Sequence, residues 1–366
     1  MQTLTEWQWK SLLNDYNFAD GHARQKPFEF EMPLVESLSE IYWDMKAKDQ
    51  KVIEARFLDS FFGLAGVNVN FYERYSVHYS SSLSIEITAN ICRKKSWRVG
   101  LLHPTFDNIP DIYRRHHVSL VPIEEGELES GNWDFLSDVE CLFLVLPNNP
   151  TGFSLSAATF ERLAQQCAAH NVTLILDFSF RFFAPVYFDH YQILDALGCS
   201  YITIEDTGKT LGHHDLKIGF SVASEHMIEE LSMITDEILL NVSPFTISFL
   251  QNCFELYRKK SGMNSLRELI KANYATLGKL CESSAMSIVG QGRHLSVAWV
   301  NIDLPISTTE LVERLLEKGI GILPGQPFCW NDPKRGEEHI RLALLRDPDV
   351  FERGLNRISE EIRTIL

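Results

Sequence analysis

Short apolar runs alternate with longer amphipathic segments from about residue 82 of the sequence onward. The segment SLSIEITANICRKK at 82–95 has helical spacing of its apolar positions, and the apolar run WRVGLL follows it at 97–102. The same alternation continues through apolar runs at 118–123, 139–146, 172–178 and 200–206. It is typical of a mainly parallel sheet that helices cover on both faces. We therefore predict an α/β fold with this sheet in a large domain.

The pattern becomes mostly helical after Lys217 and changes again near residue 276. Helical spacing covers 224–240, 245–259 and 265–282. The last part combines short apolar runs with helical segments at 307–319 and 347–366, which predicts a small α+β unit. We expect three parts, which are an N-terminal segment at 1–25, a small domain of 26–48 together with 276–366, and a large domain at 49–275.

The composition narrows the class of protein. With 366 residues, of which 45% are hydrophobic and 23% charged, the chain is long enough for two globular lobes. A formal net charge of −15 disfavours a nucleic-acid partner, and no apolar run is long enough to span a membrane. Seven cysteines without a C-x-x-C pair, and a start without a signal pattern, predict a cytoplasmic protein with no metal site.

Polar residues follow three of the predicted strands at the point where each strand ends. Asn148 and Asn149 come after one apolar run, Asp177 ends the next, and Asp206 and Lys209 follow the third. Ligands of such sheets bind beyond the carboxyl ends of the strands. Because a purely structural strand end does not need these groups, the coincidence predicts a functional site.

Each of these residues also has an ordinary structural interpretation. A lone lysine in a turn such as the one around Lys209 is usually a solvated surface residue, although it can form an imine with an aldehyde cofactor. The motif PNNPTG at 147–152 is a rigid turn that can aim the Asn149 amide inward. The carboxylate of Asp177 can cap a helix or pair with a charged partner such as a protonated pyridine nitrogen.

The NNPTG motif, Asp177, Lys209 and Lys217 together resemble the fold-type I pyridoxal-phosphate enzymes of the class I/II aminotransferase family. The resemblance implies pyridoxal 5'-phosphate as cofactor, bound by the large domain. It implies that Asn149 binds the phenolic oxygen of the cofactor, that Asp177 holds its ring nitrogen protonated, and that Lys209 forms the imine.

The same resemblance assigns further contacts. Phe106, in HPTFDN, stacks on the cofactor ring, and Ser179 is a further cofactor contact. Ser81 and Ser82 at a helix start, with Lys217, bind the phosphate, although a run of serines is also an ordinary helix cap. The list of cofactor-binding residues is thus Ser81, Ser82, Phe106, Asn149, Asp177, Ser179, Lys209 and Lys217. Arg341, in HIRLALL, binds the substrate carboxylate.

The motifs ADGHARQ at 19–25, HPTFDN, IEDTGK and DLKIG resemble a narrower group, the PLP-dependent L-arginine oxidases. These use dioxygen without metal or flavin and oxidise L-arginine through quinonoid intermediates. Their products are 4-hydroxy-2-oxo-arginine with 2-oxo-arginine, or a dehydroarginine imine, in natural-product pathways. The resemblance implies a homodimer and an N-terminal lid at 1–25.

This narrower resemblance adds three residues to the predicted site. Asp20 and Asp206 would bind the arginine guanidinium, and His22 would move protons or position a water. Asp20 could instead belong to a loop that ends a helix. The chain has Phe180 where transaminases usually place a tyrosine and Asp206 where they place a serine. The alternative is a conventional aminotransferase acting on a cationic amino acid, which needs a 2-oxo acid acceptor.

Overall fold

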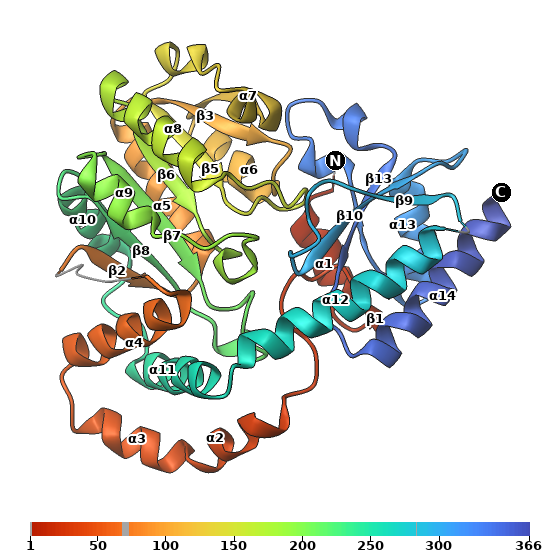
Figure 1. Cartoon of the computed structure of the whole chain (residues 1–366), viewed down its shortest axis with the longest axis horizontal. Helices are drawn as coiled ribbons and strands as arrows, with labels where there is room; N and C mark the ends of the chain where they lie inside the picture. The colour runs from red at the N-terminus through yellow and green to blue at the C-terminus, as the bar shows by residue number, and fades with distance from the viewer. Residues whose placement is uncertain (1, 68–72, 283) are drawn as a thin grey trace.

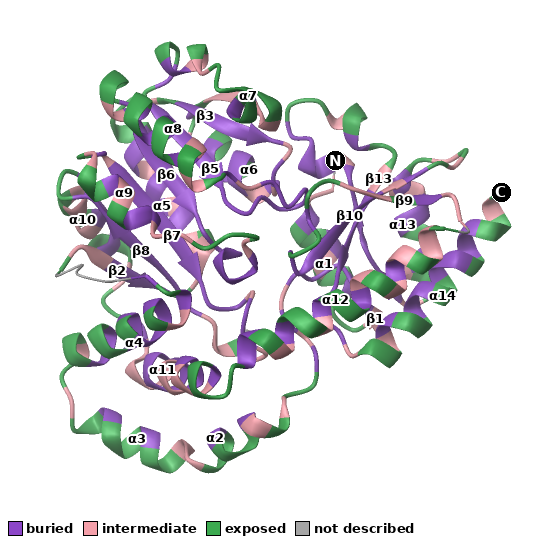
Figure 2. Ribbon diagram, viewed as in Figure 1, coloured by how far each residue is buried: buried purple, intermediate pink, exposed green. Residues whose placement is uncertain are grey.

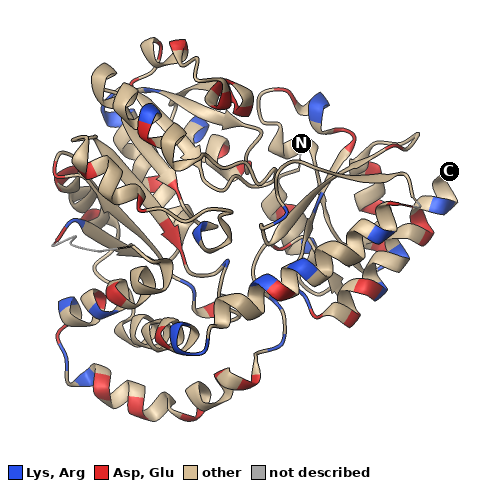
Figure 3. Cartoon of the chain, in the orientation of Figure 1, with Lys and Arg blue, Asp and Glu red and all other residues tan. Residues whose placement is uncertain are grey.

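A computed structural model describes residues 2–67, 73–282 and 284–366 (Figure 1). Residues 1, 68–72 and 283 lie outside the described residues. The predicted ranges 1–25, 49–275 and 276–366 each include some of them. The chain forms a large lobe and a smaller lobe beside it (Figure 1). Acidic residues are spread over both lobes and do not gather in one place (Figure 3).

The large lobe is built on a seven-stranded sheet in the order β2-β8-β7-β6-β5-β3-β4. The strands are β2 (Tyr75–His78), β3 (Arg98–His103), β4 (Ser119–Glu124), β5 (Cys141–Val145), β6 (Thr173–Asp177), β7 (Tyr201–Asp206) and β8 (Gly219–Ala223). Only β8 runs antiparallel to its neighbours. The predicted α/β fold with a mainly parallel sheet is therefore confirmed. Strands β2 and β8 were not predicted, because β2 has four residues and precedes the alternating region, and β8 lies where the helical region was expected to begin.

Helices cover both faces of this sheet, and its central strands are buried throughout (Figure 2). Burial on both faces explains why β5 and β6 appear in the sequence as continuous apolar runs. The helices of this lobe are α4 (Gln50–Ala65), α5 (Ser81–Lys94), α6 (Asn108–Arg115), α7 (Glu125–Ser130), α8 (Ala157–His170), α9 (His190–Ala196), α10 (Ile228–Ile238) and α11 (Pro244–Lys259).

The small lobe contains a four-stranded antiparallel sheet in the order β12-β13-β10-β9. Its elements are β9 (Met286–Val289), β10 (Val297–Ile302), β12 (Leu323–Pro324), β13 (His339–Ala343), α12 (Gly262–Cys281), α13 (Thr308–Glu317) and α14 (Pro348–Ile365). The N-terminal segment belongs here, since β1 (Tyr16–Asn17) pairs with β11 (Ile320–Gly321) and α1 (Leu4–Ser11) packs on β11 and β12.

Two contacts change the expected division of the chain. The boundary predicted at residue 276 falls inside α12, a long helix that packs on both α11 and α14. Helices α2 (Met32–Glu36) and α3 (Leu38–Lys46), expected in the small domain, instead lie beside α11, on which α3 packs (Figure 1). Tyr257 of α11 fixes this segment, because its hydroxyl donates to Glu31 at 3.1 Å.

Short 3₁₀ turns join several of these elements: η1 (Glu29–Glu31), η2 (Asp134–Ser137), η3 (Arg181–Phe183), η4 (His214–Leu216), η5 (Gln326–Phe328) and η6 (Pro333–Gly336). Within the described residues, no helix has the length and apolar character required to cross a lipid bilayer. All seven cysteines are unpaired. The described residues also contain no group of three or more His, Cys, Asp or Glu side chains placed to bind a metal ion.

Candidate active site

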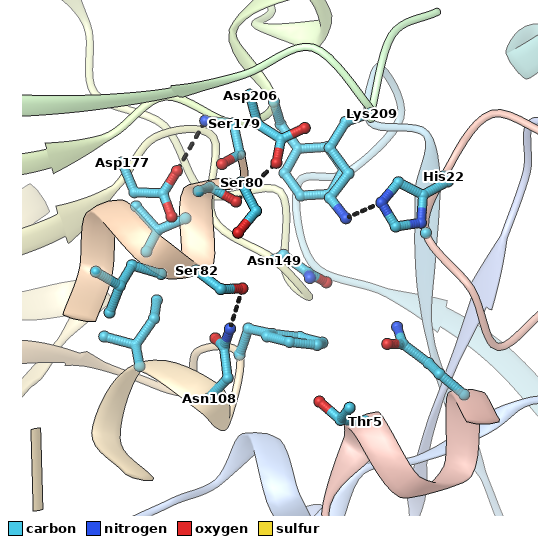
Figure 4. Close-up of a pocket in the computed structure, with 18 of the residues that line it drawn as sticks. Thr5, His22, Ser80, Ser82, Asn108, Asn149, Asp177, Ser179, Asp206 and Lys209 are labelled. Atoms are coloured by element: carbon cyan, nitrogen blue, oxygen red, sulfur yellow. Dashed lines mark hydrogen bonds between the residues drawn. The ribbon is translucent and has the colours of Figure 1, made fainter. Parts of the chain in front are cut away.

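A pocket lies where the carboxyl ends of the central strands meet the start of α5 and the N-terminal segment (Figure 4). The predicted site residues that line it are His22, Ser81, Ser82, Phe106, Asn149, Asp177, Ser179, Asp206, Lys209, Lys217 and Arg341. The three polar strand ends thus meet in one place, as the rule for ligand sites in parallel sheets requires.

Lys209 extends from the loop after β7 toward the N-terminal segment. Its Nζ lies 3.3 Å from Nε2 of His22, and Nζ of Lys217 lies 3.1 Å from the same nitrogen (Figure 4). Burial lowers the pKa of Lys209, against the raising effect of the charge of Asp206. A lowered pKa increases the fraction of neutral amine, which is the form that attacks an aldehyde or accepts a proton.

The close approach of these two lysines depends on a glycine. A Cβ atom at Gly208 would lie 2.9 Å from Cδ of Lys217 and 3.1 Å from Oδ1 of Asp206. The absence of a side chain at position 208 therefore gives Lys217 room beside the loop that carries Lys209.

Asp20 holds His22 in place from outside the pocket. Its Oδ1 lies 2.5 Å from Nδ1 of His22 and accepts the His22 backbone N–H at 3.0 Å, while its Oδ2 accepts from Nε of Arg24 at 2.8 Å. Asp20 was predicted to bind the substrate guanidinium. The structure does not bring it to the pocket wall, and both of its oxygens contact side chains of the same segment.

Burial and the neighbouring charges set the protonation state of the imidazole, and the contact with Asp20 sets its tautomer. Burial, followed by the charge of Lys209, lowers the pKa of His22 to about 4, although Asp20 acts in the opposite direction. Burial would raise the pKa of Asp20, but the hydrogen bond and charge of His22 and the charge of Lys209 keep it well below its usual range. At neutral pH a neutral His22 that donates from Nδ1 to Asp20 therefore presents Nε2 as an acceptor to both lysines.

Two buried arginines bind the backbone of the N-terminal segment. Arg346 donates to the carbonyl oxygens of Asn17 at 2.6 Å, Asp20 at 2.5 Å and His22 at 2.9 Å. Arg341 donates from Nη2 to the carbonyl of Ala19, and its buried Nε has no partner in the described part of the chain. Burial lowers the pKa of Arg341 to about 9, so its guanidinium stays charged at neutral pH and has a donor to spare for a carboxylate.

Asp177 ends β6 with its carboxylate in the pocket. Its Oδ1 accepts the backbone N–H of Ser179 at 2.8 Å. Burial raises the pKa of Asp177 to about 6, and the charges of Asp206 and Glu205 act in the same direction, against the hydrogen bonds from Ser179. Such a buried acid is stabilised by a cationic N–H partner. Oδ1 of Asn149 is also buried without a partner among the described residues.

Asp206 contacts the start of α5. Its Oδ2 accepts from Oγ of Ser81 at 2.7 Å, and its Oδ1 accepts the backbone N–H of Gly208 at 2.6 Å. Burial would raise the pKa of Asp206, but the charges of Lys209 and His22 and the bond from Ser81 lower it. Asp206 is therefore a carboxylate at neutral pH, placed between Lys209 and the serines predicted to bind phosphate.

The structure adds pocket residues that the sequence did not single out. Thr5 and Gln8 of α1 and Asn108 at the start of α6 line the pocket, and Nδ2 of Asn108 donates to Ser82 at 3.3 Å. The capping box of Thr3 and Glu6 marks α1 as a helix in the sequence. No local signal indicates which face of that helix meets the pocket.

Residues 72–358 match the model of the aminotransferase class I and II family, and the chain therefore belongs to that family. The structure of MppP soaked with the product 2-ketoarginine is similar, with 34% sequence identity and a TM-score of 0.89 over 94% of this chain and 99% of that one. The α-aminoadipate aminotransferase LysN from Thermus thermophilus, complexed with N-(5'-phosphopyridoxyl)-L-leucine, is 17% identical. Its TM-score is 0.83 over 100% of this chain and 95% of that one, which supports the fold alone.

Curated relatives are more distant. LL-diaminopimelate aminotransferase from Nitratidesulfovibrio vulgaris is 25% identical over 63% of this chain and 58% of its own length. Transaminase BacF from Bacillus subtilis is 23% identical over 62% of this chain and 56% of its own. The matches thus span less than two thirds of these relatives. The chain is an enzyme of the pyridoxal-phosphate-dependent aminotransferase superfamily with the fold-type I architecture, and its cofactor is pyridoxal 5'-phosphate.

Proposed function

We propose that this enzyme uses dioxygen to oxidise L-arginine. The products would be 4-hydroxy-2-oxo-arginine with 2-oxo-arginine, or a dehydroarginine imine, in a natural-product biosynthetic pathway. The observation that carries the proposal is the position of His22, whose Nε2 lies 3.3 Å from Nζ of Lys209. A second proton acceptor beside the lysine suits a reaction that removes protons from more than one carbon. The similarity to MppP, whose structure was soaked with the product 2-ketoarginine, supports arginine as substrate.

The residues of the pocket fit the cofactor. We propose that Asp177 accepts the ring N–H, that Asn149 binds the phenolic oxygen and that Phe106 stacks on the ring. Ser179, in the loop that follows Asp177, would contact the cofactor. The phosphate would be bound by Ser81 and Ser82 at the start of α5 and by Lys217. When bound, pyridoxal phosphate supplies an aldehyde that joins an amine and a ring that withdraws electrons from Cα.

The substrate would lie between Arg341 and Asp206. Arg341 has a buried Nε donor that can bind the substrate carboxylate, and Asp206 is a carboxylate that can attract the guanidinium. Asp20 contacts His22 and Arg24, and we therefore propose that it orients His22 and does not itself bind the guanidinium.

Lys209 and His22 would carry the protons. The amine of Lys209 would take the proton from Cα, and Nε2 of His22 would take the proton from Cβ or orient a water molecule. Thr5 and Gln8 of α1 would exclude bulk water from the pocket, since water quenches reactive intermediates. Each two-electron oxidation would convert one dioxygen and two hydrogens from the substrate into hydrogen peroxide. Hydrolysis of the oxidised substrate by water would then release ammonium and 2-oxo-arginine. Formation of the hydroxylated product would consume a second dioxygen and a second water.

An oxygen electrode tests this function directly. With L-arginine and no 2-oxo acid, we expect oxygen uptake and peroxide, and mass spectrometry should identify the products. The alternative is a conventional aminotransferase acting on a cationic amino acid, which the curated relatives favour because they are named as aminotransferases. Transamination of L-arginine with pyruvate, without oxygen uptake, would overturn the oxidase proposal in favour of that alternative.

We also propose that the enzyme works as a homodimer in the cytoplasm. Helices α2 and α3 leave Met32, Val35 and Trp43 exposed at the edge of the large lobe, where a second copy could cover them. The seven unpaired cysteines suit a reducing compartment.

A further inference from the structure

A buried ion pair lies behind the two loops that carry the chemistry of the pocket. Nε of Arg181 lies 3.1 and 3.0 Å from the two carboxylate oxygens of Glu205, and Nη2 lies 2.5 Å from Oε1. The side chain of Arg181 is 5% exposed and that of Glu205 0%. Neither residue lines the pocket, and neither was singled out in the sequence.

The pair joins two segments that are separate in the sequence. Arg181 begins η3, four residues after Asp177, in the loop that follows β6. Glu205 lies near the end of β7, directly before Asp206 and close to Lys209. One ion pair therefore connects the loop that follows Asp177 to the end of the strand that leads to Lys209.

Further contacts fix the pair in one geometry. The hydroxyl of Tyr191 donates to Oε1 of Glu205 at 2.8 Å and lies 2.8 Å from Oγ1 of Thr203. The guanidinium carbon of Arg181 lies 4.2 Å from the ring centre of Phe178, which is the residue after Asp177. A planar guanidinium held at two carboxylate oxygens and stacked on a ring has little freedom to rotate.

We propose that Arg181 and Glu205 are positioning residues that hold the loop after β6 against the end of β7, so that Asp177 and Lys209 face the cofactor from defined places. Stability alone does not explain the pair. A buried ion pair is often no more stabilising than apolar side chains of similar volume, because desolvation offsets the attraction. Unlike an apolar pair, the bidentate contact fixes the distance and orientation of the loop after β6 relative to the end of β7.

The inference rests on membership of the pyridoxal-phosphate family and is independent of the proposed substrate. The test is the double variant Arg181→Met/Glu205→Met of the holoenzyme. Because the pair has no net charge, its replacement leaves the total charge unchanged. The charge of Glu205 also acts on Asp177, so Arg181→Lys, which keeps both charges and loses the fork, separates geometry from electrostatics. We expect the pH midpoint of the visible absorption band of the cofactor to shift by about one pH unit. With a working substrate, kcat should fall about a hundredfold while KM changes less than about threefold.

The control is Lys95→Met/Glu230→Leu, which removes an ion pair with a 2.7 Å contact between α10 and the end of α5. It should leave the midpoint at the wild-type value. The proposal would be overturned if the double variant of Arg181 and Glu205 has the same Tm as the wild type and the same pH midpoint of the cofactor absorption band. If that variant does not fold, Arg181→Lys decides, because it keeps the charge and loses the fork. A shifted midpoint supports the proposal, and a wild-type midpoint refutes it. The midpoint needs no substrate, so this result stays separate from a failure of the arginine proposal.

Discussion

The environment of Lys209 defines the first residue-scale prediction. Its amine lies among His22, Lys217 and Asp206, and burial lowers its pKa, which suits a nucleophile. In Lys209→Ala, borohydride reduction of the loaded protein should leave no cofactor bound covalently, as measured by the mass of the intact chain. Lys217→Ala should still retain reduced cofactor, because only one amine is expected to form the bond. Covalent retention in Lys209→Ala would contradict the assignment.

The contact between Asp20 and His22 gives a second prediction. If Asp20 acts by orienting His22, Asp20→Asn and His22→Ala should each lower oxygen uptake with L-arginine about a hundredfold. The double variant should be no worse than His22→Ala alone, because the two residues act as a unit. Both variants should change the product ratio more than the affinity for the cofactor. Additive losses in the double variant would show that Asp20 has a separate role, such as guanidinium binding.

At this scale the sequence predicted the residues whose positions follow from the ends of strands. Asn149, Asp177 and Lys209 meet because parallel strands bring their carboxyl ends together. Arg346 was missed, since its function is to bind backbone carbonyls of a distant segment and no motif encodes that contact. The contacts of Asp20 were likewise unpredictable, because ADGHARQ does not reveal which of its side chains turns inward.

Helix α1 lines the pocket and is attached at its start to the large lobe. The backbone N–H of Leu4, at its first turn, donates to Oδ2 of Asp107 at 2.7 Å. Asp107 is the neighbour of Phe106, and its Oδ1 is buried without a partner in the described chain. A carboxylate at a helix start satisfies an otherwise unpaired donor and is worth about 1 kcal/mol. Asp107 therefore links α1, with Thr5 and Gln8, to the wall of the pocket.

This link gives a pH prediction. Burial raises the pKa of Asp107 to about 7, against the hydrogen bond from Leu4. A carboxyl group whose pKa is raised on folding contributes stability that is fully present below its ordinary pKa and is lost as the pH rises through the folded value. Asp107→Asn keeps an acceptor for Leu4 and cannot ionise. The Tm of Asp107→Asn minus the Tm of the wild type should therefore be more positive at about pH 8 than at about pH 5.5.

Thermal melts at both pH values make the comparison, and Asp44→Asn is the control, because the carboxylate of Asp44 is largely exposed. The control should differ from wild type equally at the two pH values. A pH-independent difference for Asp107→Asn would show that the carboxyl of Asp107 is already ionised in the folded protein across this range and that its pKa is not raised.

The elements themselves were predictable to different degrees. The alternating segments of the large lobe appeared as expected, since their periodicity reflects burial on one or both faces. β8 was missed because it lies after Lys217, where the pattern was expected to become helical. The position of α3 depended on a tertiary contact with α11, which lies far along the chain and which no local pattern encodes.

At the scale of the whole molecule, the exposed side of α2 and α3 bears on assembly. Trp43 is 69% exposed, and its ring contacts that of Tyr42 at 5.2 Å between centres. If a second copy covers this side, Trp43→Glu should convert a dimer into a monomer in light scattering, because a charge would be buried without a partner. Trp9→Glu is the control, since Trp9 is equally exposed on α1. A dimer that persists in Trp43→Glu would exclude this side as the interface.

The pairing of β1 with β11 and the attachment of Leu4 to Asp107 hold the start of α1 next to the pocket. Helix α14 ends instead at the far side of the small lobe (Figure 1). A purification tag or fusion partner joined ahead of α1 would lie beside the pocket that Thr5 and Gln8 line. One joined after α14 would not, which makes that side the better point for immobilising this enzyme on a sensor or resin.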